Sequence, residues 1–399
     1  MTYLLIIILL LYCIFKYDIH QDKKNKWNWY HFIMFLLILI SGLGYRMGGD
    51  GMVYLAQYKN YSIDDGFGWD ALTCYPNRMP GWVLLVKICK CITEDYWLFK
   101  LVHAIILNIL IFASIRRITN MVFTTLLFYF VLIYFDVNFQ ILRQAISMGF
   151  FLYSMRYVQD KKWIKYYFCI ILAISFHEGA VICFLFPLFL RVKFDKKSII
   201  IFSSIVVFIS IFGETIVMFL IERMVPDILA NKTTYYTNEI DSGGGVLIIN
   251  LCLSVVIPAM YVYISRNEHG IKCVKIGALV YGIIYVMNFF FPILYRFSYY
   301  FQMFFYIIYI ELFYRIACNK GFKVKFAKVN NRILLYSKEA RLKYIILIIL
   351  FIIIRARMYF LPYGETGMPT WVQYYPYSSV LFEEPDINRE KFIKHLDID

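Results

Sequence analysis

The chain alternates long apolar runs with short charged segments along most of its length. The runs over residues 198–212 and 343–354 offer no polar face to water. Because they are continuous rather than alternating in polarity, they predict membrane helices and not barrel strands. We place about twelve helices, at residues 2–16, 28–45, 96–115, 119–135, 139–158, 163–176, 178–190, 198–221, 246–265, 273–291, 296–317 and 342–358.

The composition agrees with this pattern. The 399 residues are 61% hydrophobic and 17% charged, whereas soluble domains average about 45–50% and about 25%. The composition therefore excludes the two or three soluble domains that this length would allow. It predicts an all-α, polytopic integral membrane protein.

The net charge of +14 lies in short clusters of Lys and Arg that occupy alternate loops. Such clusters mark cytoplasmic loops, which places both termini on the outer side. The basic residues form no stripe with aromatic platforms, so we expect no nucleic-acid partner. The predicted organisation is a transmembrane domain (1–358) with outer loops 46–80 and 223–245, a re-entrant or interfacial segment 80–92, a basic cytoplasmic loop 318–342, and an extracytoplasmic tail (359–399).

Two predicted helices, 163–176 and 178–190, are too short to cross a bilayer. A hydrocarbon core needs about 20 helical residues. The two helices meet at His177 and Glu178, which predicts a polar recess below the outer surface. His177 and Glu178 are candidates for a general base or an orienting pair, or His177 is a hydrogen-bonded core residue. No metal is indicated, because the candidate ligands do not converge by spacing.

Further ionisable groups lie at the outer ends of apolar helices, where a buried charge costs about 2.5–3.5 kcal/mol. Arg46 and Asp50 flank Gly48-Gly49, whose flexibility permits a tight turn. The two charges form either an interfacial salt bridge or a substrate clamp, with Arg46 on an anion and Asp50 on hydroxyls.

Arg143 lies near the start of helix 139–158, and Gln140 and Gln144 share a face one turn apart beside it. This face is expected to point inward. Arg143 either reaches toward the interface or offers a planar fork to phosphate oxygens. Arg296 with Tyr299 opens the last helix but one, as an interfacial aromatic belt or as a surface for sugars and pyrophosphate.

Arginines and an acid–base pair at one cavity beside aromatic rings suit a sugar linked to polyprenyl pyrophosphate. The arginines would neutralise the leaving pyrophosphate, and a carboxylate or histidine would deprotonate an acceptor hydroxyl. No cofactor is required for this chemistry.

Four blocks carry a resemblance to a known family, the EpsG family. They are YRMGGDGMVYLAQY at 45–58, LRQAISMGFFLYSMRYVQDKKW at 142–163, LAISFHEGAVICFLFPLF at 172–189 and YRFSYYF at 295–301. Their order and spacing match over residues 30–305. Members resemble Wzy-type polysaccharide polymerases.

The resemblance implies a bacterial inner-membrane protein of GT-C-like architecture, with its active site facing outward. It would polymerise repeat units of a capsule, exopolysaccharide or O-antigen. The implied partners are undecaprenyl-pyrophosphate-linked oligosaccharide, membrane lipids and a chain-length regulator. By motif, it assigns functional roles to Arg46, Asp50, Arg143, His177 and Arg296.

One departure concerns the catalytic base. The family often has an acidic residue before the proline that follows the first outer loop, whereas Met79 precedes Pro80 here. The base would then be Asp50, Asp70 or Glu178. A membrane acyltransferase, a flippase and a ligase of lipid-linked glycan remain alternative functions.

Overall fold

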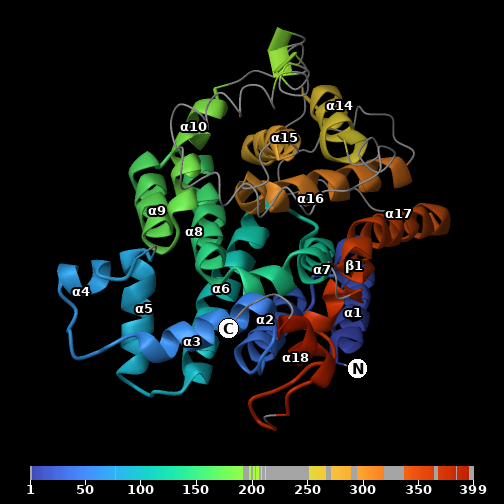
Figure 1. Ribbon diagram of the computed structural model, residues 1–399. Helices are drawn as coiled ribbons and strands as arrows, with labels where there is room; N and C mark the ends of the chain where they lie inside the picture. The colour runs from blue at the N-terminus through green and yellow to red at the C-terminus, as the bar shows by residue number, and fades with distance from the viewer. Residues whose placement is uncertain are drawn as a thin grey trace. The chain divides into compact units, whose positions relative to one another are not determined.

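The computed structural model describes residues 2–76, 78–191, 251–266, 271–288, 294–318, 337–363, 367–382 and 384–394, with isolated positions between 197 and 212. The described chain is mostly helical (Figure 1), which confirms the all-α prediction. Among these residues the sheet is one short antiparallel pair, β1 (Pro362–Tyr363) with β2 (Met368–Pro369). Predicted loop 223–245, most of helix 198–221 and most of loop 318–342 lie outside the described residues.

The chain divides into two compact units. The first comprises Met1–Cys183 and Ile345–Asp399, and the second comprises Phe184–Tyr344. Most of the predicted site residues therefore belong to the first unit, whereas Arg296 and Tyr299 belong to the second.

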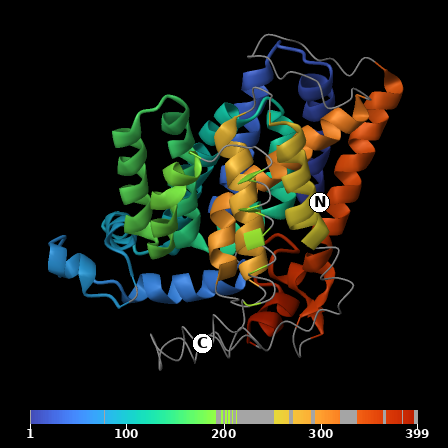
Figure 2. The same cartoon turned by 90° about the horizontal axis from the view of Figure 1, so that it is seen from above.

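A helical bundle forms the centre of the first unit. In it α2 packs on α6, α6 on α8, α8 on α9, and α1 on α7. Figures 1 and 2 show α8 and α9 running side by side. The bundle helices are α1 (Thr2–Cys13) with the π-helical turn η1 (Ile14–Ile19), α2 (Lys26–Gly42), α6 (Tyr96–Ile118), α7 (Val122–Leu132), α8 (Leu142–Gln159) and α9 (Trp163–Phe176).

Polar side chains link these apolar helices at a few buried points. The Tyr30 hydroxyl donates to the Phe112 carbonyl at 2.7 Å, and the Tyr134 hydroxyl donates to the Leu37 carbonyl at 2.6 Å. Buried polar groups need such partners, because an unpaired one costs free energy in an apolar interior. The hydroxyls therefore fix the register of helices that apolar packing alone would leave free to slide.

Within its described residues, the segment predicted as the first outer loop contains two helices. It contains α3 (Gly49–Asn60) and α4 (Trp69–Thr73), and α5 (Pro80–Lys90) follows it. Helix α5 packs on α4, α6 and α9. Its lysines turn inward: Lys87 Nζ donates to the Gly66 carbonyl at 2.9 Å, and Lys90 Nζ donates to the Tyr61 carbonyl at 2.6 Å. These two lysines therefore hold the loop between α3 and α4.

The C-terminal tail packs on the segment that joins α2 to α3. The Tyr45 amide donates to the Ser378 carbonyl at 2.9 Å, and the Val380 amide donates to the Leu43 carbonyl at 2.9 Å. The Arg389 side chain is fully buried and donates to Ser378 Oγ at 3.1 Å; this burial lowers the pKa of Arg389. The tail contains η6 (Arg357–Phe360), the strand pair, η8 (Thr370–Gln373) and α18 (Ile387–Lys394).

The second unit is built around two helices that pack closely together, α15 and α16. A Cβ atom at Gly277 would lie 2.2 Å from Cδ2 of Phe304, so glycine permits this approach. The rings of Tyr281 and Phe305 stack with their centres 4.5 Å apart. The described helices here are α10 (Phe186–Phe189), η4 (Cys252–Val256), α14 (Ile257–Ile264), α15 (Lys272–Met287) and α16 (Tyr295–Ala317); η3 (Glu178–Leu185) and α17 (Lys338–Ala356) cross the unit boundaries.

Within the described residues, two helical segments are long and apolar enough to cross a membrane, Thr2–Ile19 and Tyr96–Ile118. Shorter apolar helices cover Val122–Leu132, Trp163–Phe176, Glu178–Phe189 and Cys252–Ile264. The predicted number of membrane crossings therefore stays a prediction.

Candidate functional site

The turn that opens α3 is set by a close approach between two segments of backbone. Gly48 has a φ of +77°, and a Cβ atom there would lie 2.4 Å from the Phe139 carbonyl oxygen. A side chain fits neither that dihedral angle nor that space. The tight turn expected from Gly48-Gly49 is present, and it brings Asp50 to the segment that precedes Arg143.

Amide side chains from two distant segments bind the first N–H groups of α3. The Gly49 amide donates to Gln373 Oε1 at 2.9 Å, and the Asp50 amide donates to Gln140 Oε1 at 3.0 Å. The Gly48 amide donates to the Gln373 carbonyl at 3.1 Å, and Gln140 Nε2 donates to Gln373 Oε1. These N–H groups would otherwise attract an anion. Here the amides of Gly48, Gly49 and Asp50 are engaged, so these three are not open to an anion.

Arg46 pairs with the C-terminal tail. The sequence left two interpretations open, and one of them was a salt bridge between Arg46 and Asp50. Its Nε and Nη2 atoms each donate to the Glu390 carboxylate at 2.7 Å. This pairing raises the pKa of Arg46. The backbone of Arg46 has a φ of +46°, in the left-handed region. The predicted Arg46–Asp50 salt bridge is therefore wrong, because a bidentate carboxylate from far along the chain takes the guanidinium.

We expect Glu390→Gln to lower the free energy of unfolding by about 1–2 kcal/mol, since it removes a charge-assisted, partly buried pair. Thermal unfolding in detergent measures the change. Glu384→Gln, at an exposed position just before α18, is the matched control and should be neutral. A double-mutant cycle with Arg46→Gln should give a coupling energy of about 1 kcal/mol; a coupling near zero would contradict this interpretation.

Arg143 lies in the first turn of α8, which begins later than predicted. The preceding turn, η2 (Asp136–Gln140), is π-helical, and Ile141 has non-helical dihedrals (φ −97°, ψ 49°). Gln140 and Gln144 therefore do not share a helical face. Gln140 reaches α3, whereas Gln144 is buried.

Arg143 and Asp50 lie close to the same buried phenol, Tyr54. Burial raises the pKa of Tyr54, the positive charge of Arg143 opposes that rise, and the negative charge of Asp50 adds to it. Arg143 also hydrogen-bonds the Tyr54 hydroxyl. The Asp50 side chain is exposed, so a carboxylate open to solvent lies near a half-buried guanidinium. Two of the predicted residues therefore lie near the same tyrosine, and their role in one site stays a prediction.

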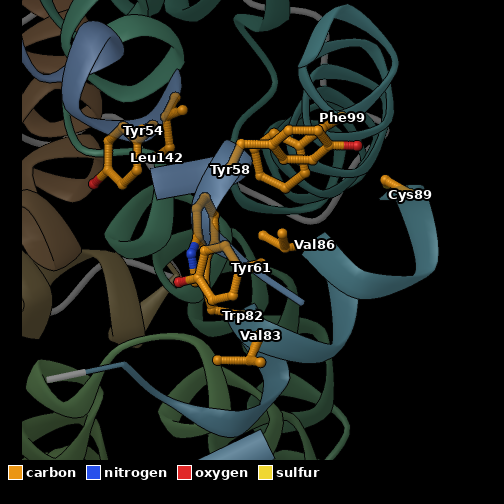
Figure 3. Close-up of a cluster of buried hydrophobic side chains, with 9 residues drawn as sticks. All are labelled: Tyr54, Tyr58, Tyr61, Trp82, Val83, Val86, Cys89, Phe99 and Leu142. Carbon is orange, nitrogen blue, oxygen red and sulfur yellow. The ribbon is translucent and has the colours of Figure 1, made fainter. Parts of the chain in front are cut away.

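Tyr54 belongs to a cluster of buried, largely aromatic side chains. Figure 3 shows Tyr54 beside Leu142, the residue before Arg143, with Tyr61 and Trp82 in the same group. The Tyr54 and Trp82 ring centres are 5.4 Å apart. The cluster joins α3, α5, α6 and the start of α8, so it holds the backbone next to Arg143 in place.

Arg78 is a further arginine near this cluster that the sequence did not single out as a candidate. Its Nε atom donates to Gln57 Oε1 at 3.2 Å. Burial raises the pKa of Tyr61, and the charges of Arg78 and Arg143 both oppose that rise. Two arginines therefore lie around one phenol. The available signal was an arginine directly before Met79-Pro80, in a motif where an acid was expected.

The predicted break between two short helices is present at His177. Helix α9 ends at Phe176, His177 is extended (φ −154°, ψ 125°), and η3 begins at Glu178. His177 is buried, and its Nδ1 atom accepts from the Gly179 amide at 3.1 Å. In the neutral ring the proton is then on Nε2, which is a donor. Glu178 is exposed.

Arg296 and Tyr299 lie in the second unit, near the start of α16. Arg296 is exposed, and Tyr299 is buried with its hydroxyl hydrogen-bonded to that of Tyr295. Their assignment to substrate stays a prediction. Across the ranges that the structure describes, no three His, Cys, Asp or Glu side chains gather as ligands for a metal ion.

The model of the EpsG family matches residues 27–379. The chain belongs to the EpsG family. The match covers Arg46, Asp50, Arg143, His177 and Arg296, and it ends before Glu390. No curated protein and no solved structure matches the chain. Membership of the EpsG family associates the chain with polysaccharide biosynthesis and with the membrane.

Proposed function

We propose that this EpsG-family protein polymerises lipid-linked polysaccharide repeat units. It would act as a glycosyltransferase that moves a growing glycan from polyprenyl pyrophosphate onto an acceptor sugar hydroxyl. We place the reaction at the outer face of a bacterial inner membrane that the chain crosses many times. The proposed donor is undecaprenyl-pyrophosphate-linked oligosaccharide, and no cofactor takes part in the proposed step.

The arrangement of Asp50, Arg78 and Arg143 around Tyr54 and Tyr61 carries this proposal. These residues come from α3, from the segment just before α5 and from the start of α8. Two guanidiniums and one exposed carboxylate beside aromatic rings match a pyrophosphate, an acceptor hydroxyl and the face of a sugar. This combination supports glycosyl transfer from a phosphate-linked donor.

Each residue has a defined part in the proposed step. The bond between the anomeric carbon and the pyrophosphate oxygen breaks, and Arg143 and Arg78 stabilise the charge that develops on the departing pyrophosphate. The acceptor oxygen attacks the anomeric carbon and gives its proton to Asp50. Among the candidate bases, Asp50 is favoured because its carboxylate is exposed and lies near the arginines.

The other candidate residues have supporting roles in this proposal. His177 is buried with Nδ1 engaged, so it would donate from Nε2 and orient a substrate oxygen rather than accept its proton. Gln144, also buried, belongs to the same helix end as Arg143. Arg296 and Tyr299 are proposed to bind substrate, on the sequence alone, and Glu178 is the alternative base that the experiment below tests against Asp50.

Gene deletion followed by complementation tests this function. Without the protein, surface glycan on a gel should collapse from a ladder to single repeat units on the lipid carrier. Asp50→Asn should restore the ladder about 10²-fold more slowly than wild type, whereas Glu178→Gln should restore it within a few fold. A normal rate with Asp50→Asn would overturn the assignment of the base.

The same gel separates the alternative functions. Full-length polymer without its acyl groups would indicate an acyltransferase. Repeat units trapped inside the cell would indicate a flippase. Finished polymer that stays on the lipid carrier would indicate a ligase. Each of these results would reject the polymerase.

A further inference from the structure

A cavity of about 450 Å³ lies in the first unit, between the segment after α2, helix α3, the start of α6 and the tail. Its walls are mostly apolar. Met52 and Leu55 of α3 line it, whereas Tyr54 and Tyr58, on another face of the same helix, belong to the aromatic cluster. Helix α3 thus separates this cavity from the Arg143 site.

Two cations also line the cavity, Lys100 and Arg46. Arg46 is held by Glu390, but Lys100 is different. Its side chain is 4% exposed, its Nζ donates to the Asn138 carbonyl at 3.1 Å, and it lies 4.5 Å from the centre of the Phe139 ring. Considering the described residues alone, no carboxylate oxygen comes within 4.0 Å of this nitrogen.

A buried ammonium without a counter-charge is costly, and it has three N–H donors to satisfy. One donor of Lys100 is engaged with a carbonyl oxygen. Because Lys100 lines the cavity, an anion bound there would be placed to accept from the others. Asp95 is the acidic residue of the lining; it is exposed and pairs with the Thr93 hydroxyl at 3.4 Å.

The position of the cavity indicates what kind of anion it would take. Lys100 lies one turn into α6, a helix long and apolar enough to cross a membrane. Trp97, at the same helix end, is partly exposed and also lines the cavity. Tryptophan and lysine at the end of a membrane helix lie at the depth of lipid headgroups. A phosphate attached to an apolar chain fits both the cation and the walls.

We propose that this cavity binds a polyprenyl phosphate, with the phosphate at Lys100 and the first isoprene units against Met47, Met52 and Leu55. Binding of the lipid phosphate follows from the cavity itself. That the cavity holds the carrier end of the second substrate, a polyprenyl pyrophosphate, rests on the proposed function, since a polymerase takes two lipid-linked substrates in each cycle.

The test uses the full-length protein in detergent and native mass spectrometry with undecaprenyl phosphate. Wild-type protein should bind it, and Lys100→Met should weaken binding at least about tenfold, which equals about 1.4 kcal/mol. Leu55→Trp, which fills the cavity without touching the charge, should weaken binding equally. Arg117→Ala, at an exposed arginine of α6, should bind as wild type does. Folded Lys100→Met and Leu55→Trp proteins that both bind normally would overturn the proposal.

Competing ligands identify the source of the phosphate. Inorganic phosphate and polyprenol should each bind far more weakly than undecaprenyl phosphate, because each lacks half of the recognised molecule. Equal binding of phosphatidylglycerol would overturn the choice of an isoprenoid. The proposed function fails separately, through normal glycan growth in Arg143→Ala cells, and that result leaves the binding measurement intact.

Discussion

Arg143→Ala is expected to abolish glycan chain growth while the protein stays folded and reaches normal levels. The guanidinium lies beside Tyr54 and Asp50 at the start of α8, where it would meet the departing pyrophosphate. Removing one group that stabilises developing charge typically costs about 10²–10³-fold in rate. The ladder of surface glycan and the turnover of lipid-linked repeat units by purified protein measure this loss.

Two further variants define the role of Arg143. Arg143→Lys keeps the charge but loses the planar pair of donors, so it should recover only part of the rate. Arg117→Ala removes an exposed arginine from α6 and should leave chain growth unchanged. If Arg143→Ala cells build a normal ladder, the guanidinium does not bind the leaving group and the proposed site is wrong.

Gly48→Ala is expected to destabilise the protein by about 3 kcal/mol or more. The new Cβ would lie 2.4 Å from the Phe139 carbonyl oxygen and 2.8 Å from its carbon, and backbone atoms cannot rotate away. The start of α3 must then shift from Gln140 and Gln373. Thermal unfolding in detergent measures stability, and chain growth should fall with it because Asp50 moves.

Gly66→Ala is the matched control for this prediction. Gly66 has a similar φ of +71°, but a Cβ atom there would meet nothing within 4 Å. Its substitution should cost only the left-handed backbone penalty, about 1–2 kcal/mol. Equal losses in the two variants would show that the contact with Phe139 contributes nothing, and that only the dihedral angle matters.

Local sequence signals were sufficient to place an element where residues close by in the chain mark its ends. Helix 163–176 was predicted to the residue, because His177 and Gly179 interrupt an apolar run that has no other break. The glycine turn before Asp50 was predicted for the same reason. Both features depend on residues within one or two turns of each other.

The start of α8 was placed wrongly because its cause is distant in sequence. The Asp136 carboxylate accepts from the Tyr374 hydroxyl at 3.0 Å and from the Tyr359 hydroxyl at 3.2 Å. Both tyrosines belong to the tail, which holds the π-helical turn ahead of Arg143. The sequence pattern of residues 136–144 carries no information about a contact with a residue more than 200 positions further along the chain.

The amino-acid sequence by itself determined that this chain is helical, where most of its helices lie and which family it belongs to. Apolar periodicity and helix-ending residues are local, and a backbone surrounded by apolar side chains must satisfy its hydrogen bonds within helices. Only the tertiary structure decided the partners of the charges: Glu390 for Arg46, Tyr54 for Arg143, and the Asn138 carbonyl for Lys100. It also placed Lys100 in the lining of a cavity. A long charged side chain can reach many groups, and the fold alone determines which of them lies within hydrogen-bonding distance.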